Sequence, residues 1–302
     1  MTAPAKLSRV LLTGGGGFLG AWIVKLLNAR GIAVRVFELK EDRYQIESIA
    51  SEAADKLDWV VGDVSDPVAM SDAAKECDGI IHLAGLMTPA CNAAPVLGAK
   101  VNVIGTLCAF EAAKANGIFH VTYTSSGGVF GLEDAGTPYP LTHYGAYKLA
   151  NEGNARAYWT NDRIASFGFR PFVIYGPGRD AGLTADLSLA CAAAVRGEPF
   201  VVSFSGAVAL VYVEDVALAF VEAATQRPSG ARTANLTGHA TSVEETVELI
   251  RSIADFQDIS IKGPNIPSLS TVTNDWTRCG LDLPPETTLI DGLKNTLKHS
   301  SV

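Results

Sequence analysis

The segment Arg9-Val-Leu-Leu-Thr-Gly-Gly-Gly-Gly-Phe-Leu-Gly20 decides the fold. Its first five residues read as a short buried strand, and the chain from Phe18 to Arg30 reads as the helix that follows. The turn between them holds Gly14, Gly17 and Gly20. Glycines at this spacing let the backbone approach the pyrophosphate of a dinucleotide, which then lies against free N–H groups at the positive end of the helix. A glycine-rich turn without a ligand is the alternative.

An acidic residue ends the next predicted strand. Ala33-Val-Arg-Val-Phe37 is apolar and β-branched, and Glu38 follows it directly. A carboxylate at this place binds a ribose 2′-hydroxyl and repels a 2′-phosphate. The sequence therefore predicts that NAD is preferred and that NADP is the less favoured cofactor, although Lys40 and Arg43 lie close by in the chain.

Short apolar strands alternate with helical patterns through the first half of the chain. We expect strands at 8–13, 33–38, 57–62, 79–84, 118–125 and 164–170. Such alternation predicts an α/β fold with a Rossmann-type, doubly wound parallel sheet covered by helices on both faces.

The pattern changes after Pro171, where segments rich in glycine and proline begin. We expect a dinucleotide-binding Rossmann domain at 1–170. Residues 171–302 are expected to form mainly a smaller substrate-binding lobe beside the carboxyl ends of the strands, with some segments returning to the sheet. Residues 285–298 read as a closing amphipathic helix.

Composition indicates a soluble enzyme that acts on small molecules. The chain has 302 residues, of which 48% are hydrophobic and 19% charged, which is enough to bury a substantial core. A net charge of −8 without a basic stripe argues against nucleic acid or an anionic membrane as a partner. No apolar run reaches transmembrane length, and the apolar opening is broken by glycines. We therefore expect a cytoplasmic protein.

Cysteine and histidine spacing predicts neither disulfides nor a metal site. Five scattered cysteines lack Cys-x-x-Cys spacing, so they are expected to be reduced, buried and structural. The five histidines show no ligand spacing either. His82 lies within an apolar strand pattern and is expected to be a core residue.

Tyr144-Gly-Ala-Tyr-Lys148 carries the chemistry that the sequence predicts. On a helix, positions 144 and 148 lie on one face, so a phenol and an ammonium can share a small site. The lysine cation and an oxidised nicotinamide would both favour phenolate, and Tyr144 could then exchange a proton near neutral pH. A chance match remains open for this pattern alone, but it follows the glycine turn and the pair Ser125-Ser126.

With these features in place, the sequence resembles the extended short-chain dehydrogenases/reductases, often grouped as NAD-dependent epimerases and dehydratases. The resemblance covers nearly the whole chain. The matching pieces are Thr13 to Gly20, Gly62-Asp63-Val64, His82-Leu-Ala-Gly85, Asn102-Val-Ile-Gly-Thr106, Ser125-Ser126 with Val129-Phe-Gly131, Tyr144 to Lys148, Arg170-Pro171 through Tyr175-Gly-Pro177, and Tyr212-Val-Glu-Asp-Val-Ala217.

The resemblance implies a role for each matching residue. Ser126 would hydrogen-bond the reacting oxygen, Tyr144 would be the acid/base, and Lys148 would hold the nicotinamide ribose while lowering the Tyr144 pKa. Asn102 and Asp215 could instead only tie down backbone. With the glycine turn and Glu38 included, the expected cofactor contacts are Gly14, Gly17, Phe18, Leu19, Gly20, Glu38, Asp63, Val64, Leu83, Ala84, Gly85, Asn102, Tyr144, Lys148, Pro171 and Val173.

Departures from the family pattern concern the substrate. Sugar-nucleotide members usually carry an asparagine where this chain has Val173 and an arginine where it has Val208, and both groups hold the substrate diphosphate. A compact substrate without a nucleotide is therefore expected, such as a sugar, a sugar acid or another small secondary alcohol or ketone. The candidate substrate contacts are Ser125, Ser126, His143 and Arg179, while Arg179 or Arg196 could also replace the missing diphosphate contacts.

Three classes of function remain open from the sequence. A net dehydrogenase or reductase is the first, and an epimerase with tightly bound NAD is the second. Dehydratases of the family that the chain resembles usually carry acidic residues beside the catalytic serine, whereas Gly127 and Gly128 follow Ser126, so the resemblance disfavours simple dehydratase chemistry. A non-catalytic NAD-sensing regulator on the same fold is the third class. The family resemblance also implies a homodimer formed through helices near 93–116 and 144–160.

Overall fold

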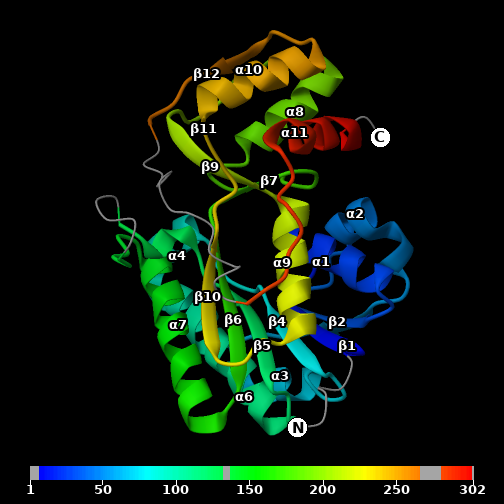
Figure 1. Cartoon of the computed structure of the whole chain (residues 1–302), viewed down its shortest axis with the longest axis vertical. Coiled ribbons are helices and arrows are strands. Elements are labelled where there is room, and N and C mark those ends of the chain that lie inside the picture. The colour runs from blue at the N-terminus through cyan, green and yellow to red at the C-terminus, as the bar shows by residue number, and fades with distance from the viewer. Residues whose placement is uncertain (1–6, 132–136, 266–279, 301–302) are drawn as a thin grey trace.

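The computed structural model describes residues 7–131, 137–265 and 280–300. A large parallel sheet with helices on both faces forms the lower part of the molecule in Figure 1, and a smaller group of helices and short strands lies above it. The chain begins at the lower end and finishes in the upper part (Figure 1).

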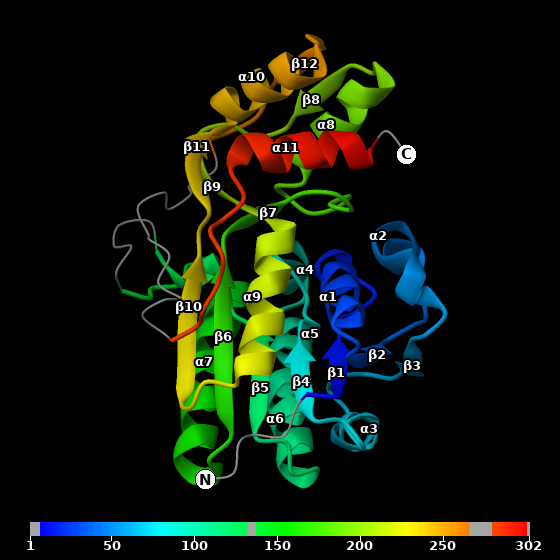
Figure 2. The ribbon, with the colours of Figure 1, turned by 45° about the vertical axis from the view of Figure 1, so that its right-hand side comes forward.

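The central sheet has seven strands in the order β10-β6-β5-β4-β1-β2-β3, and every neighbouring pair is parallel. The order reverses direction between β1 and β4, as in a doubly wound Rossmann sheet, so the predicted fold class is confirmed. Figure 2 shows these strands side by side. Their bounds are β1 Arg9–Thr13, β2 Ala33–Glu38, β3 Asp58–Val61, β4 Gly79–His82, β5 His120–Thr124, β6 Ala165–Pro171 and β10 Ala231–Leu236.

Helices cover both faces of this sheet, because its strands are apolar on both sides. One face carries α1, α2 and α9, and the other carries α3, α6 and α7. The first seven helices are α1 Phe18–Ala29, α2 Tyr44–Ala54, α3 Pro67–Ala73, α4 Thr88–Ala93, α5 Pro95–Ala99, α6 Gly105–Ala115 and α7 His143–Asp162. A π-helical segment, Lys100–Ile104, joins α5 to α6, and a 3₁₀ turn, Gly127–Val129, follows β5.

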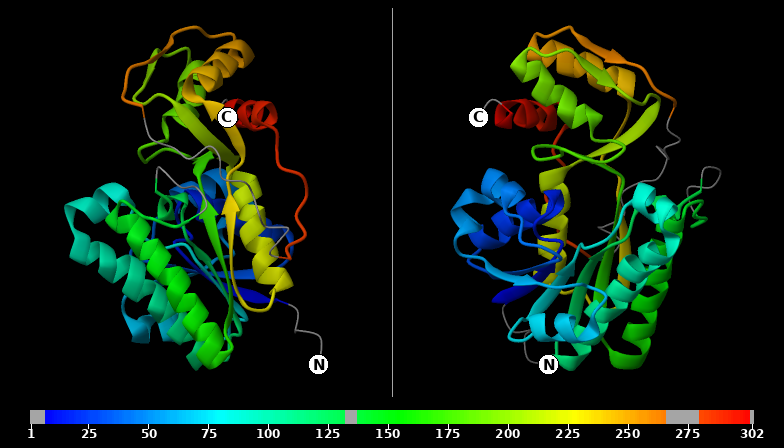
Figure 3. Two further views of the ribbon diagram at one scale, coloured as in Figure 1. Left: turned by 60° about the vertical axis from the view of Figure 1, so that its left-hand side comes forward. Right: turned by 180° about the vertical axis from the view of Figure 1, so that it is seen from behind.

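The upper part contains the remaining short strands and three of the remaining helices, and Figure 3 shows it from two further sides. It holds a three-stranded sheet, β11-β9-β7, and a two-stranded sheet, β12-β8. The strands are β7 Val173–Tyr175, β8 Phe200–Val202, β9 Ala207–Tyr212, β11 His239–Ser242 and β12 Ile259–Ile261. The last helices are α8 Asp186–Arg196, α9 Val213–Gln226, α10 Val243–Ala254 and α11 Leu289–His299.

The C-terminal half is not confined to the upper part. β10 pairs with β6 along its whole length and so completes the edge of the large sheet. Helix α11 lies where the amphipathic pattern of 285–298 predicts a closing helix, starting a few residues later. The division of the chain at residue 170 into a cofactor domain and a substrate lobe stays a prediction.

The glycine turn after β1 depends on the absence of side chains. Gly14 has φ +73°, and a Cβ atom there would lie 2.7 Å from the backbone nitrogen of Ala84. A Cβ at Gly20 would lie 2.5 Å from the carbonyl oxygen of Gly14. Only glycine allows both the positive φ and the close approach of β1, β4 and α1.

One continuous helical stretch, Pro95–Ala115, has the length and mean hydropathy of a membrane span. Half of its most apolar window is buried in the protein. Its C-terminal part, α6, packs against α3, α7 and the sheet. This burial is typical of a core helix in a soluble fold, which passes the same test of length and composition.

Four cysteines, Cys77, Cys91, Cys108 and Cys191, are buried as free thiols. Burial raises the pKa of the Cys191 thiol to about 12 and that of Cys77 to about 11, so both are protonated and unreactive at neutral pH. They are therefore structural, as predicted. Cys279 lies outside the described residues.

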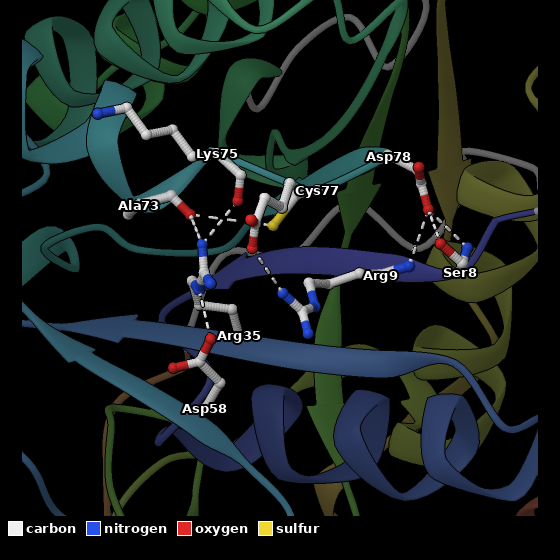
Figure 4. Close-up of polar contacts among 9 residues, drawn as sticks. Ser8, Arg9, Arg35, Asp58, Ala73, Lys75, Cys77 and Asp78 are labelled. Carbon is white, nitrogen blue, oxygen red and sulfur yellow. Dashed lines mark hydrogen bonds and ion pairs between the residues drawn. The ribbon is translucent and has the colours of Figure 1, made fainter.

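Polar contacts tie the strands together at the end of the sheet opposite the glycine turn (Figure 4). Arg35 on β2 donates to the Asp58 carboxylate of β3 at 2.6 Å, and to the carbonyl oxygens of Ala73 and Lys75 at 3.0 and 2.7 Å. Nearby, Asp78 accepts the backbone N–H of Ser8 at 2.8 Å, just before β1. The contacts of Arg35 join three successive segments of the chain.

Replacing Arg35 by alanine should lower the free energy of unfolding by about 1–3 kcal/mol, because charge-assisted hydrogen bonds to the carboxylate and to the carbonyl groups are lost. Arg9→Ala is the control, since the ion pair of the Arg9 side chain with Glu76 at 3.4 Å is exposed and its loss should change stability by less than about 0.5 kcal/mol. Urea unfolding of both variants measures the difference. Equal effects in the two would contradict the assignment.

Candidate active site

A cavity of about 630 Å³ lies along the carboxyl ends of the strands of the large sheet. This volume is within the range of small-molecule and cofactor sites. Its position is the crevice in which doubly wound sheets bind ligands. The lining residues are Gly14, Gly17, Phe18, Leu19, Gly20, Glu38, Leu39, Gly62, Asp63, Val64, Leu83, Ala84, Gly85, Leu86, Met87, Leu97, Val101, Thr124, Ser125, Ser126, Tyr144, Lys148, Pro171, Phe172, Ile174 and Arg179.

The first turn of α1 forms one wall of the cavity. Gly17 is the N-cap and supplies no side-chain hydrogen bond, and the first turn contains no acidic residue. The backbone N–H groups at this helix end and the positive end of its dipole therefore remain available for an anion. This part of the site is built as the glycine spacing predicts.

Two carboxylates lie at another part of the cavity wall. Glu38 accepts a hydrogen bond from the backbone N–H of Gly16 at 3.0 Å, and burial raises its pKa although this bond opposes the shift. The Ser65 hydroxyl and N–H, which donate to Asp63, lower the pKa of that carboxyl. Asp63 also forms an ion pair with Lys100 at 3.5 Å. Both acidic side chains are therefore hydrogen-bonded acceptors that can receive further donors.

Asn102 lies behind the cavity wall rather than in it. Its Nδ2 donates to the carbonyl oxygens of Leu86 and Gly98 at 3.1 and 3.0 Å, which ties the segment after β4 to the π-helical turn. A Cβ at Gly85 would lie 2.6 Å from its Oδ1. Asn102 Nδ2 also donates to Cys91 Sγ at 3.3 Å, so the side chain ties down backbone, as the sequence left open, and one buried thiol besides. The Asp215 carboxylate likewise accepts hydrogen bonds from the backbone N–H and the hydroxyl of Thr287, both at 2.8 Å.

Ser126 and Tyr144 meet where the 3₁₀ turn touches the start of α7. Ser126 Oγ accepts the backbone N–H of Gly128 at 3.0 Å and also hydrogen-bonds to the Tyr144 phenol. Gly145 permits this meeting, since a Cβ there would collide with the carbonyl oxygen of Gly128. Thr142 caps the helix by accepting the Gly145 N–H at 3.0 Å. The backbone therefore holds the serine and the tyrosine in fixed positions.

The pKa of Tyr144 is raised overall, because burial outweighs the hydrogen bond with Ser126 and the nearby charge of Arg179. Burial raises the pKa to about 12, and the hydrogen bond with Ser126 opposes this only in part. The sequence predicted the opposite direction, with Lys148 as one cause. Lys148 Nζ lies 5.6 Å from the centroid of the Tyr144 ring, and its hydrogen bonds go elsewhere. The sequence suggested two causes of a lower Tyr144 pKa, the Lys148 cation and the charge of an oxidised nicotinamide. Only the nicotinamide charge remains.

Lys148 is held by Thr124 at the end of β5. Its Nζ donates to the Thr124 carbonyl oxygen at 2.9 Å and to the hydroxyl at 3.0 Å. Burial lowers the pKa of Lys148 to about 8. Thr124 was missed from the sequence, although its place directly before Ser125-Ser126 at the end of a predicted strand was a usable signal.

A buried polar network behind the serine pair was also missed. Ser125 Oγ donates to Glu152 Oε1 at 2.5 Å, and Arg170 binds both oxygens of that carboxylate at 2.7 and 2.6 Å. Glu152 follows Lys148 by four residues, so it lies on the helix face that carries Tyr144 and Lys148. This spacing could have revealed it. The network links β5, α7 and β6 beneath the cavity.

Three predicted contacts lie outside the cavity wall. His143 is exposed and stacks on Tyr147, with ring centroids 6.1 Å apart. Val173 packs against the hydrophobic core, and its neighbours Phe172 and Ile174 line the cavity instead. Asn102 is the third, for the reason given above. The remaining predicted cofactor, catalytic and substrate residues all line the one cavity.

His82 faces the core rather than a metal. Its ring Nδ1 lies 2.7 Å from Thr13 Oγ1, and burial lowers its pKa to about 3. Lys148 acts in the same direction. Among residues 7–131, 137–265 and 280–300, no group of three or more His, Cys, Asp or Glu side chains is arranged to hold a metal ion.

A profile of the NAD dependent epimerase/dehydratase family matches residues 10–236. The chain belongs to this family. It is 30% identical, over 96% of its own length and 97% of the relative's, to a UDP-glucose 4-epimerase of Mycolicibacterium smegmatis. It is 32% identical to a ceramide reductase of Caulobacter vibrioides, over 70% of this chain and 59% of the relative.

The fold matches that of solved structures in the same group. A UDP-glucose 4-epimerase of Thermus thermophilus, solved in complex with NAD, superposes with a TM-score of 0.81 at 23% identity. The match covers 97% of this chain and 98% of that one. The chain is therefore an enzyme of the extended short-chain dehydrogenase/reductase group with NAD as its cofactor. The alternative of a non-catalytic regulator gains no support from these relatives.

The residues of the cavity fit NAD. Gly14 and Gly85 keep its wall free of side chains at places where a Cβ would collide with neighbouring atoms. The uncapped first turn of α1 offers N–H groups for a pyrophosphate. Glu38 and Asp63 offer acceptors for sugar hydroxyl or adenine amino groups, and Tyr144 and Lys148 line the same cavity.

Lys148→Met should stabilise the protein at pH 7, because burial lowers the lysine pKa from 10.5 to about 8. Between these values the unfolded chain binds more protons, so the free energy of unfolding rises with pH, and the buried charge costs stability below about pH 8. We expect a gain of about 1 kcal/mol at pH 7, after the loss of the Thr124 hydrogen bonds, that shrinks towards pH 10. Urea unfolding at both pH values measures it. A less stable variant at pH 7 would refute this view of Lys148.

Proposed function

We propose that the enzyme interconverts a secondary alcohol and a ketone on a small substrate, with Ser126, Tyr144 and Lys148 as its catalytic residues. NAD, when bound, accepts or returns the hydride. Ser126 holds the reacting oxygen, and Tyr144 moves the proton of the hydroxyl. Lys148 holds the nicotinamide ribose, and Thr124 positions its ammonium. The observation that supports this proposal most is the convergence of all three side chains in the cavity that fits NAD.

The substrate is proposed to lack a nucleotide. Val208 is 1% exposed and lies in the hydrophobic core, and Val173 also packs against that core. Neither position therefore offers a polar group to a diphosphate. Arg196 is exposed and pairs with Glu198 at 2.7 Å, so it does not replace them. Ser125 and Ser126 supply the polar contacts, and Phe172 and Ile174, from the start of the proposed lobe 171–302, supply apolar ones.

Epimerisation with retained NAD is the second candidate. It is favoured by the relative that matches along almost the whole chain, which is a UDP-glucose 4-epimerase. Both candidates use the same proton and hydride steps, so Ser126, Tyr144 and Lys148 keep their roles. The two candidates differ in whether NADH is released or is oxidised back to NAD while still bound.

Absorbance at the reduced-nicotinamide band distinguishes the two candidates. The purified enzyme is mixed with NAD and a panel of sugars, sugar acids, small alcohols and nucleotide sugars. We expect NADH to accumulate in proportion to one class of small compound. No net NADH, together with inverted stereochemistry of a nucleotide sugar, would favour the epimerase and contradict the substrate argument from Val173 and Val208.

We also propose a cytoplasmic homodimer. Val96 and Ile104 expose 85% and 44% of their surface along the helical stretch before and within the π-helical turn, and exposed apolar side chains that gather on one face are typical of a protein interface. The exposed faces of α5, the π-helical turn and α7 would form it. Sedimentation equilibrium at micromolar concentration tests the proposal, and a monomer at all concentrations would contradict it.

Tyr144→Phe should reduce turnover by at least about 100-fold while NAD still binds, because only the proton-transferring hydroxyl is lost. Steady-state kinetics with the active compound of the panel measures turnover, and calorimetric titration with NAD measures binding. Tyr147→Phe is the matched control, since the Tyr147 hydroxyl donates to the Pro95 carbonyl and takes no part in the site. Substantial turnover in Tyr144→Phe would refute the acid/base role.

Glu38→Ala should narrow the preference for NAD over NADP, because the carboxylate that repels a 2′-phosphate is removed. The two dissociation constants are compared in the variant and in the unaltered enzyme. Asp42→Ala is the control, because this nearby carboxylate is exposed and engaged by Lys40 at 3.1 Å. An unchanged ratio in Glu38→Ala would mean that another group reads the ribose.

A further inference from the structure

Arg179 lines the cavity near the glycine turn, but it belongs to a loop in the second half of the chain. The loop follows β7 and carries the side chain of Arg179 into the cavity wall. The Arg179 Cζ lies 5.5 Å from the centroid of the Phe18 ring, and Phe18 is the first residue of α1. In Figure 2 this loop, in green beside β7, lies above α1 and points towards α2.

Hydrogen bonds on both sides of Arg179 hold the loop in place. Trp22 Nε1 on α1 donates to the Pro177 carbonyl oxygen at 3.0 Å. Gln45 Nε2 on α2 donates to the Asp180 carboxylate at 2.8 Å. Both donors belong to the half of the chain that carries the glycine turn. The loop is therefore fixed to the two helices beside the cavity.

The backbone of the loop requires two glycines. Gly176 has φ +139° and Gly178 has φ +87°, which are conformations that other residues rarely adopt. A Cβ at Gly178 would lie 2.7 Å from Gln45 Oε1. The loop thus has one well-defined shape, and this shape places Arg179 before any ligand binds.

The guanidinium has hydrogen-bonding capacity that the described part of the chain does not use. Its Nε is buried without a hydrogen-bond partner, and none of the described carboxylates forms an ion pair with Arg179. The nearest acidic residue in sequence, Asp180, is engaged by Gln45. Buried charges in proteins are normally paired, so an arginine in this state is suited to an anionic ligand.

A second positive feature lines the same cavity. The first turn of α1 begins at Gly17, has no side-chain cap and contains no acidic residue. Its free N–H groups and its dipole attract an anion on their own. Arg179 lies against Phe18 in that turn. The N–H groups at the start of α1 and the guanidinium of Arg179 lie close together. As a pair they suit an extended anion that has acceptor oxygens on more than one side.

We propose that Arg179 binds the pyrophosphate of NAD, facing the first turn of α1. Hydrogen bonds from Trp22 and Gln45 hold the loop that carries Arg179. The sequence placed Arg179 with the substrate. Its charge does act on Tyr144, but its contact with Phe18 also puts it beside the glycine turn. The proposal rests on NAD as the cofactor and is independent of the roles proposed for Ser126, Tyr144 and Lys148.

Calorimetric titration with ADP, NAD and adenosine tests the proposal without any turnover. ADP carries a pyrophosphate, and adenosine carries none. For Arg179→Gln we expect the dissociation constants of ADP and NAD to rise by about 10- to 100-fold, as the loss of charge-assisted hydrogen bonds predicts. The dissociation constant of adenosine should change by less than about twofold. Arg179→Lys should show a smaller loss than Arg179→Gln, since it keeps the charge but not the planar fork.

Arg196→Gln is the control for a general effect of charge, because Arg196 is exposed and pairs with Glu198. It should leave all three dissociation constants unchanged. Thermal unfolding confirms that each variant is folded. If Arg179→Gln does not fold, Arg179→Lys carries the test together with the salt dependence of ADP binding to the unaltered enzyme, which should exceed that of adenosine.

Three results would overturn the proposal. Unchanged ADP and NAD binding in Arg179→Gln is the first. An equal loss for adenosine is the second, because it would mean that the loop has collapsed rather than that a phosphate contact is missing. Unchanged cofactor binding with a raised KM for the substrate is the third, and it would assign Arg179 to an anionic group of the substrate. A failure of the proposed reaction would leave these binding measurements valid.

Discussion

The close approach of β1, α1 and β4 at the glycine turn is the constraint on which the site depends. A Cβ at Gly14 would lie 2.7 Å from the Ala84 nitrogen, so a side chain there would push β4 away from the turn. Gly20 admits the first turn of α1 to the same place. With these contacts made, the ends of the neighbouring strands line one cavity. The packing of the backbone therefore fixes the position of the cofactor site independently of its polar side chains.

The chemistry in this cavity is shaped by burial. Helix α7 presents Tyr144, Lys148 and Glu152 on one face, and each meets a group near the end of β5: Ser126, Thr124 and Ser125 respectively. Burial favours the neutral forms of the phenol and of the ammonium, since it raises one pKa and lowers the other. Both groups are thus poised to respond to charge introduced by a ligand.

The sequence was most informative where one residue type is required by the backbone or by periodicity. The glycine turn, the order of the strands and the pair Tyr144 and Lys148 could be predicted because each depends on spacing within one segment. Spacing also pointed to Glu152 and Thr124, but their partners Ser125, Arg170 and Lys148 come from separate elements, so the hydrogen bonds themselves could not be predicted. The position of Asn102 behind Gly85 also depends on tertiary packing. The rise of the Tyr144 pKa in the protein without cofactor could not be predicted, because burial depends on the whole fold.

The central claim is that the substrate carbon exchanges a hydride with NAD beside Tyr144. Turnover of a substrate that carries deuterium on its reacting carbon tests this claim most directly, and it does so for a dehydrogenase and an epimerase alike. The label on the nicotinamide is measured by mass spectrometry after the reaction is quenched. For a dehydrogenase we expect deuterium in the nicotinamide ring. For an epimerase, in which the hydride returns to the substrate, we expect deuterium retained on the reacting carbon of the product, and in both cases a primary isotope effect on a single turnover. Loss of the label to water, with none in the nicotinamide, would contradict the claim.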